Sequence, residues 1–169
     1  MSKWKWSYEI TMKIGIISDS HYNLKAIDNA ICLAGEMDYW FHAGDSIDDA
    51  AYLETVTKKP VFKVVGNIDW CSPGPKEVLT EIAGKRIYMT HGHLFGVKMG
   101  LDTISERAEQ VMADIIIYGH SHVGLQKQIG DKLFLNPGSV SEPRDNLAPS
   151  FMIMQIENGE INVQRIFLK

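Results

Sequence analysis

The stretch IIIYGHSHVG, residues 115–124, joins three consecutive isoleucines to two histidines that flank a single serine. The β-branched run predicts a short buried strand. That strand would end at Gly119, so His120 and His122 follow its carboxyl end directly. Because an imidazole is costly to bury without a partner, two of them at this position indicate a site that uses them.

The same order, an apolar run followed by polar residues, recurs along the chain. The apolar run 13–18 is followed by Asp19-Ser20-His21, and the run 38–45 ends in Gly44-Asp45. The run 61–67 leads into Gly66-Asn67-Ile68-Asp69. A hairpin segment that begins at residue 77 is followed by His91-Gly92-His93. In α/β sheets the carboxyl ends of the strands line one edge, where ligands bind. We therefore expect these distant groups to converge on one rim.

Helical patterns separate the first three of these strands. Asn23 can cap a helix whose apolar face is formed by Leu24, Ile27, Ile31 and Ala34. Residues 47–58 are expected to form a second helix that ends before Pro60. Strand and helix alternate here as in an α/β sheet with crossover connections.

The second half of the chain is richer in hairpins. Turns are expected at residues 83–85, at 130–131 and at 158–159, and a helix at 99–112. No repeat, low-complexity tract or linker interrupts this order. The sequence therefore predicts an α/β layered sandwich.

Length and composition fit a single domain. The chain has 169 residues, 45% of them hydrophobic and 22% charged. Residues 12–169 are expected to form this domain. Residues 1–11 are interpreted as an N-terminal extension ahead of a second plausible start at Met12, without the apolar centre of a signal peptide.

Charge and cysteine content narrow the partners and the compartment. The net charge is −4 and the pI is about 5.8, so no general basic face is available for a polynucleotide. No apolar run approaches the length of a membrane span. Cys32 and Cys71 fit no paired spacing and are interpreted as free thiols in a reducing cytosol, which predicts a cytoplasmic protein.

The polar groups at the strand ends have the chemistry of a metal site. Carboxylate oxygens and imidazole nitrogens suit Mn²⁺, Fe or Zn²⁺, and the lack of cysteine among them argues against a structural zinc site. The candidate ligands are Asp19, His21, Asp45, Asn67, His91, His120 and His122. Seven side chains are too many for one open catalytic ion, but they serve two ions roughly 3.5–4 Å apart if Asp45 is shared. His120 and His122 would point to the same side of an extended segment, and each would reach a different ion.

Each motif alone also has a structural interpretation. An Asp-x-His sequence is common by chance, and Gly44-Asp45 and Gly66-Asn67 are compatible with simple turns. The His120-Ser121-His122 segment is compatible with an exposed polar turn. The ordered recurrence of five such signals after apolar strands favours the metal site. His42, three residues before Asp45, would point to the opposite face and is interpreted as a packed residue.

The ordered motifs, together with Asn136-Pro137-Gly138-Ser139, resemble those of the calcineurin-like metallophosphoesterases. The compact length is most similar to the small prokaryotic phosphodiesterase branch, which includes the retromer scaffold subunit as a degenerate relative. This resemblance covers residues 12–169 and implies a four-layer αββα sandwich of two mixed sheets. It also implies two divalent ions, Mn²⁺ first, with Fe, Zn or Ni as alternatives, and a homodimer or homotetramer is compatible with it.

The resemblance also implies how the ligands divide. One ion would take Asp19, His21, Asp45 and His122, and the other would take Asp45, Asn67, His91 and His120. Larger family members have a histidine directly after the metal-binding asparagine, but this chain has Ile68 there. Asp69, which would pair with such a histidine, is kept. The expected catalytic residues are Asn67, Asp69 and His93. His93 is the best candidate for a substitute acid or phosphate contact, and the alternative is a histidine that supports a ligand from behind or faces solvent.

The implied reaction is hydrolysis of a small or activated phosphodiester by a metal-bridging hydroxide. Two divalent ions, two aspartates and a hydroxide leave about one positive charge, which a diester monoanion balances. Without an acid at position 68, activated aryl diesters should be cleaved well and alkyl leaving groups poorly. The alternatives are a phosphomonoesterase with the same site and a non-catalytic scaffold protein.

Overall fold

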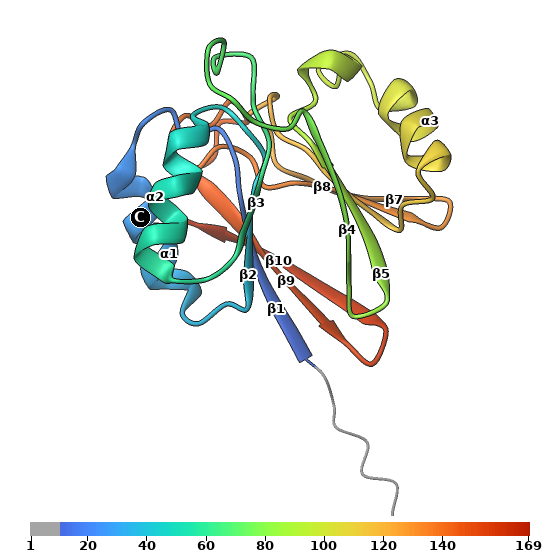
Figure 1. Ribbon diagram of the computed structural model, residues 1–169, viewed down its shortest axis with the longest axis horizontal. Coiled ribbons are helices and arrows are strands. Elements are labelled where there is room, and N and C mark those ends of the chain that lie inside the picture. Colours follow the sequence, from blue (N-terminus) through green and yellow to red (C-terminus); the bar gives the residue numbers. More distant parts are fainter. Residues whose placement is uncertain (1–10) are drawn as a thin grey trace, which may run out of the picture.

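The computed structural model describes residues 11–169, which form two five-stranded mixed sheets (Figure 1). The first sheet has the order β10-β9-β1-β2-β3 and contains β1 (Thr11–Ile17), β2 (Tyr39–His42), β3 (Val61–Lys63), β9 (Ser150–Glu157) and β10 (Glu160–Phe167). The second has the order β4-β5-β6-β8-β7 and contains β4 (Glu77–Ile82), β5 (Lys85–Thr90), β6 (Ile115–Ile117), β7 (Leu125–Ile129) and β8 (Lys132–Asn136). The central strands β1, β2 and β3 run parallel, as do β5, β6 and β8.

Helices cover the outer face of each sheet. The first sheet carries α1 (Leu24–Ala34) and α2 (Ile47–Thr57), and the second carries α3 (Asp102–Gln110) (Figure 1). A short 3₁₀ helix, η1 (His93–Phe95), precedes α3. The prediction of a four-layer αββα sandwich is therefore confirmed.

The main core lies between the two sheets, and the period of two along each strand decides which side chains enter it. Ile14 and Ile16 of β1 face this core, whereas Ile17 faces the layer of α1 and α2. In β6, Ile115 and Ile117 face the core and Ile116 faces α3. The three isoleucines are therefore buried on both faces of the sheet, as a continuous apolar run predicts.

Most expected elements are present with shifted ends. Asn23 caps α1, its side chain accepting a hydrogen bond from the Ala26 amide. Ala83 and Gly84 turn the first hairpin, both with positive φ, as a tight two-residue hairpin requires. The second and third hairpins turn at residues 130–131 and 158–159, as expected.

Several predicted elements are longer than the observed ones. The strand expected to end at Gly119 ends at Ile117, and the helix expected over 47–58 ends at Thr57. The strands expected over 38–45 and 61–67 end at His42 and Lys63. After the first of them the backbone turns, and Gly44 and Asp45 adopt positive φ values. The helix expected over 99–112 spans only Asp102–Gln110, since a turn at Gly96 occupies the preceding residues.

Residue 11, assigned to the N-terminal extension, is instead the first residue of β1, where it pairs with Glu157. The rest of that extension lies outside the described residues. Between residues 11 and 169, no helix has the length and apolar character needed to cross a bilayer. Cys32 and Cys71 are exposed and form no disulfide in this part of the chain.

Candidate metal centre

The seven candidate ligands come from loops that follow five strands, and the structure brings them to one edge of the sandwich. Asp19 and His21 follow β1, Asp45 follows β2 and Asn67 follows β3; His91 directly follows β5, and His120 and His122 follow β6. These loops gather at the upper end of the view in Figure 1, between the two sheets. The predicted convergence of the strand ends is therefore observed.

Four of these side chains form a first group. The ligand atoms of Asp19, His21, Asp45 and His122 all lie within 4.8 Å of one another. The Nε2 atom of His122 is 3.2 Å from Oδ1 of Asp19 and 3.2 Å from Nε2 of His21. Three of the four residues are buried, so these donor atoms are shielded from water.

Asp45 connects this group to a second one. Its Oδ2 atom is 3.8 Å from Nε2 of His21, and its Oδ1 atom is 3.3 Å from Nε2 of His91. The His91 Nε2 atom is also 3.1 Å from Oδ1 of Asn67. The ring of His120 lies 5.1 Å from that of His91. Asp45 thus directs a different carboxylate oxygen at each group. Asp19 also approaches the second group, with its Oδ1 atom 3.9 Å from Nε2 of His91.

Two backbone carbonyls orient the central imidazoles. His91 directs Nδ1 at the Ala43 carbonyl, 2.7 Å away, and His122 directs Nδ1 at the Glu142 carbonyl, 2.6 Å away. A carbonyl can only accept, so each Nδ1 carries the hydrogen. In the neutral tautomer the Nε2 lone pair then points into the cluster, which is how metal-binding histidines are arranged.

One buried carboxylate oxygen has no donor. Asp19 is fully buried; its Oδ2 accepts from the Ser18 hydroxyl at 2.6 Å and from the His120 amide at 3.1 Å. Its Oδ1 faces the cluster and has no hydrogen-bond partner within residues 11–169. An unsatisfied buried oxygen is costly, and a cation at this position would satisfy it. The residues present therefore fit a divalent metal.

The charges in the cluster also favour a bound cation. Burial raises the pKa of Asp45, but the hydrogen bond and charge of His91 outweigh it and bring that pKa to about 2. Burial lowers the pKa of His91, but its contacts with Asp45 and Asp19 outweigh burial and raise it. The carboxylates thus stay ionised and attract positive charge, which protons supply when no metal is bound.

The backbone at the site is unusual. Asp19, His21, Asp45, His120 and His122 all have positive φ values, between 48° and 65°. Such left-handed conformations are uncommon for non-glycine residues and gather at functional sites. The prediction that His120 and His122 lie in an extended segment is therefore wrong. Their positions follow from the left-handed turns at these residues, not from a spacing of two along an extended strand.

The predicted catalytic residues lie in different settings. Asp69 is buried and accepts hydrogen bonds from the Ser46, Ile47 and Gly66 amides, so it holds the loops after β2 and β3 together. Its carboxylate is thereby occupied by backbone donors. His93 lies at the start of η1, with its ring 5.3 Å from that of His91. Its Nδ1 atom is buried and has no partner among the described residues.

A buried chain of polar groups lies behind the first group and was missed by the sequence reasoning. The Ser20 hydroxyl donates to Asp49 at 2.6 Å and lies 2.9 Å from Nε2 of His42, which is fully buried. Asp49 also accepts from the Tyr22 amide at 2.9 Å. His42 is therefore a packed residue, as expected, and Asp49 holds the turn after β1 in addition to starting α2.

The Asn136–Ser139 loop supports the site from below. The Ser139 hydroxyl donates to the Asp19 carbonyl at 2.8 Å. The Asn136 amide donates to the Gly119 carbonyl and to the Ser121 hydroxyl, both at 3.0 Å. This loop therefore fixes the turns that carry Asp19 and the two histidines after β6.

The comparisons with known proteins agree with this geometry. Residues 12–159 match the model of the calcineurin-like phosphoesterase superfamily domain. The chain belongs to this superfamily. Among its relatives, the probable metallophosphoesterase YsnB of Bacillus subtilis is 35% identical over 90% of this chain and 89% of its own. Phosphodiesterase YfcE of Escherichia coli is 36% identical over a shorter region, 40% of this chain and 33% of its own.

Solved structures of this superfamily share the fold. A predicted phosphoesterase from Streptococcus pneumoniae is 30% identical and has a TM-score of 0.82, over 94% of this chain and 90% of that one. Vps29 of Entamoeba histolytica, solved in complex with Zn²⁺, is 23% identical with a TM-score of 0.72, over 92% of this chain and 98% of that one. At that identity the likeness to Vps29 concerns the fold alone.

Proposed function

We propose that the protein is a metal-dependent phosphodiesterase that hydrolyses small or activated diesters at a centre holding two divalent cations, Mn²⁺ first. The observation that carries this proposal is the position of Asp45, whose two carboxylate oxygens face different groups of ligands. A shared carboxylate between two sets of donors is what a pair of ions requires. A single ion would leave one of the two sets unused.

The division of ligands follows from the contacts. Asp19, His21, Asp45 and His122 would hold one cation, and Asp45, Asn67, His91 and His120 would hold the other. When bound, the two cations lower the pKa of water and withdraw charge from the phosphoryl oxygens. The oxygen and imidazole donors are compatible with Mn²⁺, Fe, Zn²⁺ or Ni²⁺.

Position 68 supports the preference for activated leaving groups. Ile68 has no side-chain proton to give, and its amide donates to Oδ1 of Asp45 at 3.2 Å. It therefore orients the shared carboxylate but cannot protonate a departing oxygen. Asp69 does not replace it, because backbone amides occupy its carboxylate.

We assign to His93 the contact with the phosphoryl or leaving-group oxygen. It is partly exposed and lies beside the second group of ligands, so its imidazole can hydrogen-bond to a substrate there. Asn67 has its oxygen directed at His91, which leaves its amide group as a further donor toward substrate.

Parallel assays in Mn²⁺ test the proposal. We expect 4-nitrophenyl diesters to be hydrolysed at least about tenfold faster than the 4-nitrophenyl monoester, and diester rates to fall steeply as the leaving-group pKa rises. Faster cleavage of the monoester would favour the phosphomonoesterase alternative. No hydrolysis of either ester by the metal-loaded protein would favour a scaffold.

A further inference from the structure

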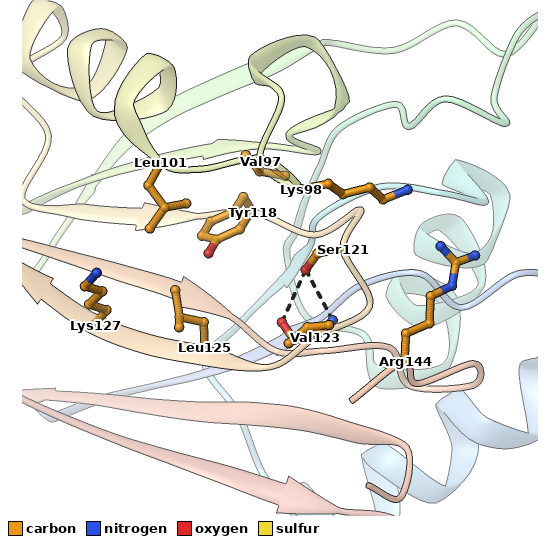
Figure 2. A pocket seen from close by; sticks show the side chains of 9 residues that line it. All are labelled: Val97, Lys98, Leu101, Tyr118, Ser121, Val123, Leu125, Lys127 and Arg144. Atoms are coloured by element: carbon orange, nitrogen blue, oxygen red, sulfur yellow. Dashed lines mark hydrogen bonds between the residues drawn. The ribbon is translucent and has the colours of Figure 1, made fainter. Parts of the chain in front are cut away.

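A pocket of about 500 Å³ lies on the outer face of the second sheet (Figure 2). It is bounded by the segment between η1 and α3, by the end of β6 and the loop that follows it, by β7, and by the segment between β8 and β9 that carries Arg144. The lining residues are Val97, Lys98, Leu101, Tyr118, Ser121, Val123, Leu125, Lys127 and Arg144. A volume of this size suits a small organic group of roughly nucleoside dimensions.

One end of the pocket is continuous with the ligand loop. Ser121 lines the pocket and stands between His120 and His122 in the chain. The Arg144 amide donates to the His122 carbonyl at 3.0 Å, which ties the Arg144 segment to the same loop. The loop that carries two of the candidate ligands therefore also forms part of the pocket wall.

The walls of the pocket are largely apolar, and the Tyr118 hydroxyl adds a polar group. Val97, Leu101, Val123 and Leu125 provide aliphatic surface, and the ring of Tyr118 forms part of the floor. The Tyr118 hydroxyl points into the pocket in Figure 2 and makes no hydrogen bond within residues 11–169. Such a surface suits a flat ring that can also accept a hydrogen bond.

The charges of the pocket are all positive. Lys98, Lys127 and Arg144 line it, and no carboxylate does. Between residues 11 and 169 none of the three forms an ion pair, so their charges are not neutralised internally. Figure 2 shows Lys98 and Arg144 on the side of Ser121, and Lys127 at the opposite end, past Leu125.

We propose that this pocket binds the non-reacting substituent of the diester, and that this substituent is an aromatic or nucleoside-like group carrying a second anion that meets Lys127. The inference rests on the proposed function and names its substrate class. Lys98 and Arg144 would face the reacting phosphoryl group, and the apolar walls would hold the ring. In the reaction, a water oxygen bonds to phosphorus, the ester bond to the leaving group breaks, and one proton is released.

Two matched substrates test the second anion. Thymidine 5′-(4-nitrophenyl phosphate), with and without a 3′-phosphate, presents the same phosphorus and the same leaving group. We expect the 3′-phosphate to lower KM about fivefold at low ionic strength, with kcat little changed, because one partly exposed charge pair is gained. The advantage should shrink at high salt.

Two variants test whether Lys127 is the residue that binds the 3′-phosphate. Lys127→Gln should abolish the advantage of the 3′-phosphate, so that the two thymidine diesters have equal KM values with this variant. Lys25→Gln, an exposed lysine on α1, serves as the matched control and should keep the advantage. Equal KM values for the two substrates with the unaltered protein, or an advantage that survives in Lys127→Gln, would overturn the inference.

A binding measurement separates this inference from the proposed function. If no diester is hydrolysed in Mn²⁺, the proposed function fails, but the pocket can still be tested with metal-free protein by titration calorimetry. Thymidine 3′,5′-bisphosphate should then bind about fivefold more tightly than thymidine 5′-monophosphate, and Lys127→Gln should remove the difference. Equal affinities would overturn the assignment of the pocket.

Discussion

Replacing Asp45 by asparagine keeps the shape of the side chain and removes the negative charge whose two oxygens face different groups of ligands. In the metal-free protein the pKa of Asp45 is about 2 instead of 3.8. That difference corresponds to about 2 kcal/mol of stabilising interaction at neutral pH. For a chain of this length we expect the melting temperature of metal-free Asp45→Asn to fall by about 4–8 °C.

The more specific expectation concerns the response to metal. A cation present at about 100 times its dissociation constant stabilises the folded state by about 2.7 kcal/mol for each site. Because Asp45 belongs to both sets of ligands, its loss weakens both sites. We expect Mn²⁺ to raise the melting temperature of the unaltered protein by at least about 5 °C, and that of Asp45→Asn by less than half as much.

Differential scanning calorimetry with and without Mn²⁺ measures both effects. Asp48→Asn is the matched control: Asp48 is exposed in the first turn of α2, so its loss should cost at most about 1 kcal/mol and leave the metal response intact. If Asp45→Asn kept the full Mn²⁺-dependent increase in melting temperature, the reasoning that Asp45 is shared by two cations would be refuted.

Three further predictions concern the same centre. His93→Ala should lower kcat about 10²-fold for diesters with poor leaving groups and only slightly for 4-nitrophenyl diesters; an equal loss for both would contradict its assigned contact with the leaving group. Without metal, unfolding at different pH values should give maximal stability near pH 6.5. Because folding raises the pKa of His91, the free energy of unfolding decreases as the pH rises above 6.5 and this histidine loses its proton. Because burial lowers the pKa of His42 to about 4, the free energy of unfolding also decreases as the pH falls below 6.5, where the unfolded chain takes up a proton that the folded chain does not. Gly66→Ala would bring a Cβ atom onto Oδ1 of Asp45 and within 2.8 Å of its Cγ, so activity in Mn²⁺ should fall about 10²-fold; undiminished turnover would show that the loop shifts freely.

The sequence was sufficient to predict which strands end at the site. Apolar runs followed by Asp, Asn or His have a simple physical meaning, because parallel strands present their carboxyl ends at one edge. Asp19, Asp45 and His91 could therefore be assigned to one rim before any distance was known. This reasoning alone predicted an α/β layered sandwich, and the resemblance to a known family implied its four layers.

Features that depend on backbone direction could not be predicted in this way. The carbonyls of Ala43 and Glu142 orient two imidazoles, but a backbone carbonyl leaves no residue-type signal. The left-handed conformations of His120 and His122 are set by tertiary contacts such as the bond from the His120 amide to Asp19. The rule that residues two apart in a strand point to the same side does not apply to them, because they lie beyond the end of the strand.

Long-range polar contacts explain the remaining differences. Asp49 has the position of a helix-starting carboxylate, but its main partner, the Ser20 hydroxyl, lies 29 positions earlier in the chain. The pocket on the outer face of the second sheet is similar: Lys98, Lys127 and Arg144 come from three separate segments and give no common sequence pattern. They come together because β7, the η1–α3 segment and the segment between β8 and β9 pack around the end of β6 and the loop that follows it.

The most direct measurement is a titration of metal-free protein with Mn²⁺, followed by electron paramagnetic resonance and by the bound stoichiometry. We expect two ions per chain and a signal of magnetically coupled Mn²⁺ that is lost in Asp45→Asn. A single bound ion per chain, or two ions with the uncoupled spectrum of isolated Mn²⁺, would contradict a centre in which Asp45 serves both cations.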